Sequence, residues 1–82
     1  MKQFIVVGLG RFGSSVATTL ANKGYDVLAI DVNEELVQEI SSEVTHSVQA
    51  DATDEEALDT LGVDEFDIAI VAIGSNVHAN IL

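Results

Sequence analysis

Residues 4–13 read Phe4-Ile5-Val6-Val7-Gly8-Leu9-Gly10-Arg11-Phe12-Gly13. An apolar run rich in β-branched residues breaks into three glycines spaced G-x-G-x-x-G, and the chain then continues into a segment that suits a helix. We interpret the stretch as a strand, a tight turn and a helix start. Gly8 would allow the turn, Gly10 would let the backbone approach a phosphate, and Gly13 would let the helix pack close to the sheet. The unpaired N–H groups of such a helix start attract anions.

A second apolar run, residues 27–30, ends in Asp31. An acidic residue about 20 positions after the first glycine is where the hydroxyls of a ribose are held in dinucleotide-binding folds. The alternative is a glycine-rich turn that only makes a tight strand-to-helix junction, with Asp31 as a helix-capping residue. That alternative accounts for Gly8 and Gly13 but gives no reason for Gly10.

The composition predicts one small domain. The chain has 82 residues, is 48% hydrophobic and contains no cysteine, so disulfides and thiolate metal sites are excluded. Its net charge of −11 repels nucleic acid and anionic membrane surfaces. Because no signal peptide or long apolar run is recognisable, we expect a soluble, cytoplasmic protein without direct membrane insertion.

Strands and helices alternate along the chain, which predicts an α/β fold with a doubly wound parallel sheet in the strand order 3-2-1-4. In the first helix we expect Phe12, Val16 and Leu20 to form the buried stripe. Thr53 and Glu56 form a predicted capping box at the start of the third helix. The expected strands are residues 2–8, 26–30, 46–50 and 68–73, and the expected helices are residues 11–23, a segment after Asn33, residues 54–61 and a helix that starts within residues 77–82.

In this order, the third and fourth strands lie at the edges of the sheet. The third strand is polar, as an edge strand usually is, but the fourth is the most apolar run of the chain. We therefore expect a truncated domain. We also expect another copy of the chain to cover strand four or the apolar tail after Gly74.

Ligands of open parallel sheets bind outside the carboxyl ends of the strands. The segments that meet there are residues 8–13, 31–33, 51–53 and 72–74, and they contain no His, Lys, Cys or Tyr, so catalysis gets no support. Asp31 would repel a 2′-phosphate, which argues against NADP. Arg11 either bonds phosphate or is a solvated surface residue, and Asp51 either lines the adenine side or assists the third helix cap.

Two further groups of residues are given structural roles. We expect His46 to be a partly buried strand residue rather than a base. The acidic residues of the third helix are expected to form a solvated face rather than a cation site, because one helix does not supply convergent oxygens.

Four stretches carry a resemblance to a known family. Residues 7–13 (V-G-L-G-R-F-G), 30–34 (I-D-V-N-E), 50–53 (A-D-A-T) and 71–74 (V-A-I-G) resemble the nucleotide-binding lobe of the RCK domains, also called KTN or TrkA-N. The closest likeness is to the regulators of the Ktr and Trk potassium-uptake systems, and it covers nearly the whole chain in register. One departure is Ala50, which stands where glycine is common in the family.

The resemblance implies that residues 1–82 form the incomplete N-terminal lobe of a regulatory subunit with a Rossmann-like fold. Such lobes bind NAD(H) or ATP/ADP, pair and assemble into rings, and control an integral-membrane potassium channel or transporter from its cytoplasmic side. We therefore expect a non-catalytic regulatory lobe and no enzyme. By the family pattern, the phosphates would lie against Gly8, Gly10, Arg11, Phe12 and Gly13, the ribose side against Asp31 and Asn33, and the adenosine against Asp51, Ala52, Ala72 and Gly74.

Two other functions remain open from the sequence. The chain would also suit the cofactor-binding half of an NAD-dependent oxidoreductase, or an ATP-preferring switch in which Arg11 meets a terminal phosphate. The sequence does not rank NADH against ATP, because both present adenosine and phosphates to the same groups.

Overall fold

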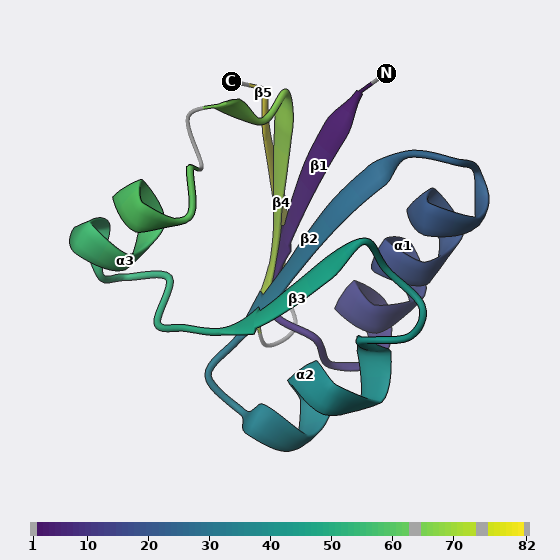
Figure 1. Cartoon of the computed structure of the whole chain (residues 1–82), viewed down its shortest axis with the longest axis horizontal. Helices are drawn as coiled ribbons and strands as arrows, with labels where there is room; N and C mark the ends of the chain where they lie inside the picture. The colour runs from purple at the N-terminus through teal and green to yellow at the C-terminus, as the bar shows by residue number, and fades with distance from the viewer. Residues whose placement is uncertain (1, 63–64, 74–75, 82) are drawn as a thin grey trace.

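The computed structural model describes residues 2–62, 65–73 and 76–81. They form one five-stranded sheet with helices on both of its faces (Figure 1). The elements in chain order are β1 (Gln3–Val7), α1 (Arg11–Asn22), β2 (Asp26–Asp31), α2 (Glu34–Ile40), β3 (His46–Gln49), α3 (Glu55–Thr60), β4 (Ile68–Ile73) and β5 (Asn76–Ile81).

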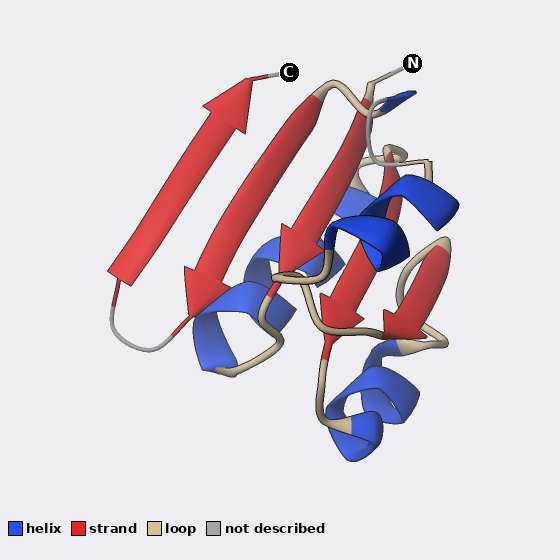
Figure 2. Cartoon of the chain, turned by 90° about the vertical axis from the view of Figure 1, so that its left-hand side faces the viewer, coloured by secondary structure: helices blue, strands red, loops and turns tan. Residues whose placement is uncertain are grey.

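The sheet has the order β3-β2-β1-β4-β5. The first four strands in the chain are parallel, which confirms the predicted order 3-2-1-4, and β5 runs antiparallel to β4 (Figure 2). β1 lies at the centre, where Phe4 pairs with Val27 of β2 on one side and with Ile68 of β4 on the other. The glycine-rich turn therefore leaves the sheet from its central strand.

The two faces of β1 contribute to two separate cores. Phe4 and Val6 pack in the cluster that includes Ala17 of α1 and Val37 of α2, on the face covered by these two helices. Ile5 and Val7 pack in the opposite cluster, with Leu58 and other residues of the α3 side. Because both faces are covered, β1 is apolar throughout, as the sequence predicts for a parallel strand.

The prediction of a helix that starts within residues 77–82 is wrong. Residues 76–81 form the strand β5, which pairs with β4 over six residue pairs, from Ile73 opposite Asn76 to Ile68 opposite Ile81. β4 is therefore an inner strand, and the segment that covers it belongs to the same chain. The expectation that strand four lies at an edge is corrected accordingly, and the association of two copies stays a prediction.

The predicted cap of the third helix is also wrong. The N-cap residue is Asp54, whose side chain accepts hydrogen bonds from the N–H groups of Glu56 and Ala57. Thr53 does not cap, because its N–H and its hydroxyl both donate to Asp51, at 2.9 and 2.6 Å. The helix consequently begins one residue later than the capping box predicts.

The predicted buried stripe of α1 is only partly correct. Val16 and Leu20 pack against the core, but Phe12 is 54% exposed. Phe12 lies at the very start of α1, beside the glycine-rich turn, where its side chain is open to solvent.

Candidate functional site

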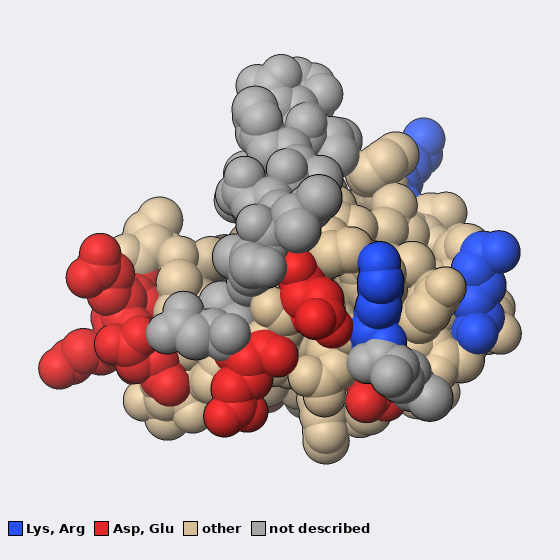
Figure 3. Space-filling model, turned by 90° about the horizontal axis from the view of Figure 1, so that it is seen from above, with Lys and Arg blue, Asp and Glu red and all other residues tan. Residues whose placement is uncertain are grey.

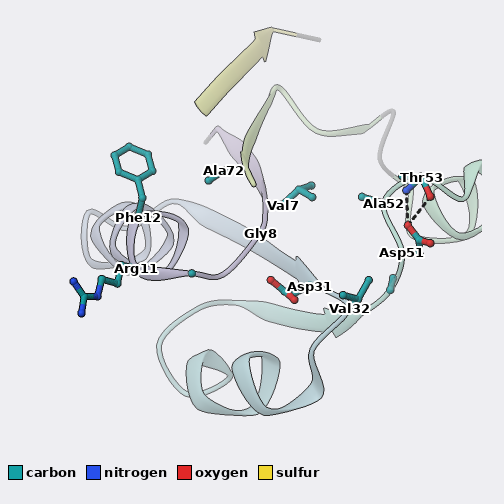
Figure 4. A pocket seen from close by; sticks show the side chains of 12 residues that line it. Val7, Gly8, Arg11, Phe12, Asp31, Val32, Asp51, Ala52, Thr53 and Ala72 are labelled. Carbon is teal, nitrogen blue, oxygen red and sulfur yellow. Dashed lines mark hydrogen bonds between the residues drawn. The ribbon is translucent and has the colours of Figure 1, made fainter. Parts of the chain in front are cut away.

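A cleft of about 530 Å³ lies at the carboxyl ends of the parallel strands (Figure 4). The chain places β2 and β3 on one side of β1 and β4 on the other, and the usual ligand site of such sheets lies where the strand order changes direction in this way. Three loops and the end of β4 surround it. The lining residues are Val7, Gly8, Gly10, Arg11, Phe12, Asp31, Val32, Ala50, Asp51, Ala52, Thr53 and Ala72.

Two of the three glycines in the turn are required by the protein itself. Gly8 has a φ of +95°, a conformation that favours glycine, and its N–H donates to the carbonyl of Ile30 at 2.8 Å. A Cβ on Gly13 would lie 1.7 Å from the carbonyl oxygen of Gly8, so no larger residue fits there. The predicted roles of Gly8 in the turn and of Gly13 in close packing are confirmed.

Gly10 has no such internal reason to be glycine. Its φ of −68° is open to any residue, and nothing in the described structure lies within 4 Å of a Cβ built on it. The space in front of Gly10 belongs to the cleft. A glycine here thus keeps room for a group that approaches the backbone from the cleft.

The start of α1 presents main-chain N–H groups without acceptors. Within the described residues, no protein acceptor pairs with the N–H groups of residues 10–13, and Gly10 offers no side-chain cap. The first helical hydrogen bond is donated by Ser14 to the carbonyl of Gly10, at 2.9 Å. Because the helix dipole is positive at this end, these donors suit an anion.

Asp31, the last residue of β2, is held by main-chain donors on both carboxylate oxygens. The N–H of Leu9 donates to Oδ2 at 2.7 Å, and the N–H of Asn33 donates to Oδ1 at 2.8 Å. A carboxylate can accept about four hydrogen bonds, so each oxygen keeps capacity for a further donor such as a ribose hydroxyl. Asp31 therefore stabilises the turns around it and also lines the cleft.

Asp51 lies across the cleft from the glycine-rich turn, at the entry to α3 (Figure 4). The hydroxyl of Thr53, and secondarily its N–H, hold the pKa of the Asp51 carboxyl below the ordinary value of 3.8. Asp51 lines the cleft and also organises the turn that leads into α3, and its place on the adenine side stays a prediction.

Arg11 and Phe12 stand at the rim of the cleft. In Figure 4 the guanidinium of Arg11 points away from Asp31, and the ring of Phe12 points away from Arg11. Both side chains are exposed. Because Arg11 is exposed, its long side chain has room to reorient toward an anion.

Most of the residues predicted to form the site come together in the cleft. Gly13 does not line it but lies buried beneath Gly8, and Asn33 instead caps α2, where its side chain accepts from Glu35 and Leu36. Gly74 lies outside the described residues. The predicted residues that line the cleft are Gly8, Gly10, Arg11, Phe12, Asp31, Asp51, Ala52 and Ala72.

Four lining residues were not named individually as site residues, although two of them lie in the segments 31–33 and 51–53 that were predicted to meet there. Each of them directly adjoins a predicted one at a strand end, which is the signal that points to them: Val7, Val32, Ala50 and Thr53. His46 lies outside the cleft at the start of β3 and is exposed rather than partly buried as expected. The four acidic residues of the α3 segment, Asp54, Glu55, Glu56 and Asp59, are exposed, as predicted for a solvated face.

The TrkA-N domain family matches residues 4–82, which is nearly the whole chain. The chain belongs to the TrkA-N family. This family is one of nucleotide-binding domains. The match confirms the resemblance found in the four sequence stretches.

Three curated proteins illustrate the similarity. Ktr system potassium uptake proteins A and C of Bacillus subtilis (strain 168) are 51% and 47% identical to this TrkA-N domain over 81 residues. Those residues are 99% of the chain but only 36% and 37% of the two relatives, so the chain spans about a third of their length. UDP-N-acetyl-D-mannosamine dehydrogenase of Methanococcus maripaludis is 48% identical over 42 residues, which are 51% of the chain and 10% of that protein.

None of the helices in the described ranges combines the length and the apolar character that crossing a bilayer requires. In the same ranges, no three His, Asp or Glu side chains come together as a potential metal site.

Proposed function

We propose that the cleft binds an adenosine-containing nucleotide, NAD(H) or ATP/ADP, and that this TrkA-N domain is the nucleotide-sensing lobe of a potassium-uptake regulator. The single observation that supports this most is the start of α1. There, N–H groups that have no acceptor among the described residues adjoin a cleft of about 530 Å³, and Gly10 leaves room for a phosphate to approach them.

Each part of the nucleotide has its own group of residues in the proposal. The phosphates bind at the glycine-rich turn, with Gly8, Gly10, Arg11, Phe12 and Gly13. Asp31 accepts hydrogen bonds from the ribose, with Asn33 close by, and the adenosine lies toward Asp51, Ala52, Ala72 and Gly74. The phosphate and ribose subsites are adjacent because Leu9 of the turn bonds directly to Asp31.

The proposed role in potassium uptake draws on the relatives, two of which are named as potassium uptake proteins of the Ktr system. In this proposal, residues 1–82 are the N-terminal lobe of a longer regulatory protein. Copies pair into a ring at the cytoplasmic side of an integral-membrane potassium transporter or channel. The nucleotide acts by binding one shape of the ring more tightly than the other, which shifts the population toward that shape.

One observation favours a second function, the cofactor-binding half of an NAD-dependent oxidoreductase. A dehydrogenase shares 48% identity with 42 residues of the chain. The lining residues of the cleft, however, include no His, Lys, Cys or Tyr that would act as acid or base beside a nicotinamide. We therefore propose a binding domain without catalytic activity.

Competition binding of ATP, ADP, NAD and NADH tests the proposal. We expect Asp31→Ala to weaken all four ligands, and Arg11→Ala to weaken ATP more than ADP if Arg11 contacts the terminal phosphate. Absence of binding by all four nucleotides would refute the nucleotide site. Steady NADH production by the full-length protein with a panel of alcohols and hydroxy acids would favour the oxidoreductase instead.

A further inference from the structure

Asp31 is hydrogen-bonded to all three loops of the cleft. Its carboxylate accepts from Leu9 in the glycine-rich turn and from Asn33 before α2. Its main-chain carbonyl accepts from the N–H of Ala50, at 3.1 Å, in the segment after β3. The residue proposed to hold the ribose therefore also ties the three loops of the cleft to one another.

The bond from Leu9 has a particular consequence for the phosphate subsite. The side chain of Leu9 is 1% exposed, its N–H is held by Asp31, and its carbonyl accepts from the hydroxyl of Ser14 at 2.7 Å. The peptide that joins Leu9 to Gly10 is planar, so the direction of the Leu9 carbonyl fixes the opposite direction of the Gly10 N–H. Leu9 therefore sets the orientation of the first free donor of the anion site.

We propose that Asp31 is a positioning residue for the phosphate subsite, in addition to its ribose contact. Its carboxylate anchors the Leu9 N–H and thereby keeps the following donors of the turn in place for an anion. The inference deepens the proposed function, because its ligand is the phosphate part of the proposed nucleotide. The positioning bonds lie within the protein itself, so they are measurable without a nucleotide.

Hydrogen exchange of the ligand-free protein tests the anchoring. In Asp31→Ala, neither N–H group keeps its carboxylate acceptor, so we expect the Leu9 and Asn33 N–H groups to exchange about tenfold faster or more. The N–H of Ala50 is the internal control, since it donates to the main chain of Asp31 and should keep its rate. Unchanged exchange at Leu9, or equal acceleration at all three positions, would overturn the anchoring role.

Asp54→Asn is the matched control variant. Asp54 also accepts from two main-chain N–H groups and is exposed, but it does not line the cleft. Asparagine is as good an N-cap as aspartate, so α3 is retained while one negative charge is lost. We expect exchange at Leu9, Asn33 and Ala50 to be the same as in the unchanged protein.

Binding of inorganic pyrophosphate tests the link to the phosphate subsite, because this probe has no ribose. Asp31→Glu keeps the charge and a carboxylate that can hold a ribose, but its longer side chain displaces both oxygens from the bonds to Leu9 and Asn33. We expect pyrophosphate affinity, measured by calorimetry, to fall about tenfold in Asp31→Glu and to stay unchanged in Asp54→Asn. Equal affinity of Asp31→Glu and the unchanged protein would refute the positioning role.

The two experiments separate this inference from the proposed function. If the unchanged protein binds neither ATP nor pyrophosphate, the nucleotide site fails, and with it the phosphate role of Asp31, while the exchange rates still decide whether Asp31 anchors Leu9. If the unchanged protein binds both, and Asp31→Glu binds pyrophosphate with the same affinity as the unchanged protein, the nucleotide site stands and the positioning role is wrong.

Discussion

Positions 10 and 13 are glycine for two different reasons. The difference predicts that alanine at position 13 reduces stability, whereas alanine at position 10 reduces ligand binding. In Gly13→Ala the new Cβ meets the Gly8 carbonyl at 1.7 Å, and main-chain atoms on both sides must move. We expect a loss of about 3 kcal/mol or more in the free energy of unfolding, measured by urea denaturation.

Gly10→Ala is the matched comparison. Its Cβ meets no described atom within 4 Å, and the change costs only about 0.5–1 kcal/mol for an alanine at the N-cap. We expect the variant to fold and to lose affinity for ATP and NADH in calorimetry, because the methyl group occupies the approach to the free N–H groups. Normal nucleotide binding by Gly10→Ala would mean that the phosphate does not come close to this position.

Asp51 and Thr53 give a prediction about pH. The bonds from Thr53 stabilise the ionised carboxylate of Asp51, so its pKa is lower in the folded protein than the ordinary value of 3.8. The contribution to stability is therefore complete above pH 3.8 and is lost as the pH falls through the lower folded value. In Thr53→Val only the N–H bond remains, and we expect the pKa of Asp51 to rise toward 3.8.

An NMR titration of the side-chain carboxyl of Asp51 measures this change. Thr60→Val is the control, because the hydroxyl of Thr60 donates to the carbonyl of Glu56 within α3 and does not touch Asp51. A pKa of Asp51 that is the same in Thr53→Val and Thr60→Val would contradict the assigned cause.

At the scale of elements, β5 is the strand that distinguishes this structure from the sequence-based expectation. Its pairing with β4 predicts cross-strand Hα–Hα NOEs at alternate pairs of the register, either the set that includes Ile70–Ala79 or the set that includes Ala69–Asn80. A helix in residues 76–81 would instead give a run of sequential HN–HN NOEs. Observation of that run would show that the pairing is wrong.

The elements that were predicted correctly have a strong local signal. β1 and β2 are continuous apolar runs. α1 ends at Asn22, with Lys23 as its C-cap residue before Gly24, whose φ of +91° is the expected left-handed conformation. The segment 76–81 has a weaker sequence signal for its secondary structure, because it is only six residues long. Its alternation of Val77, Ala79 and Ile81 with polar residues indicates a strand, but the alternation extends over too few residues to decide between strand and helix.

The candidate site was predictable to the level of its segments. The rule that parallel strands bring their carboxyl ends together identifies the glycine-rich turn and the residues after β2, β3 and β4. The individual bonds depend on tertiary packing. The bond from Leu9 to Asp31 joins residues 22 positions apart. Thr53 and Asp54 are both good caps in isolation, but the hydroxyl of Thr53 donates to Asp51, so Asp54 caps α3.

At the scale of the whole molecule, the charge distribution is strongly uneven. Fourteen acidic residues face only three Lys or Arg residues, so most of the acidic groups have no cation to pair with. Acidic side chains gather on the side of α3, and the basic side chains lie toward the side of α1 (Figure 3). Repulsion among the carboxylates therefore opposes the compact state more than ion pairs support it.

This imbalance predicts that salt stabilises the protein. At about 0.01 M salt the Debye length is about 30 Å, comparable to the size of the molecule, whose longest extent is 28 Å, and at about 0.15 M it falls to about 8 Å. We expect the melting temperature to rise between these concentrations because the repulsion is then screened. Sodium chloride and potassium chloride should act equally if screening is the cause, whereas a rise with potassium alone would indicate specific ion binding. A melting temperature that falls with either salt would mean that attractive ion pairs, rather than like-charge repulsion, dominate the electrostatics of this fold.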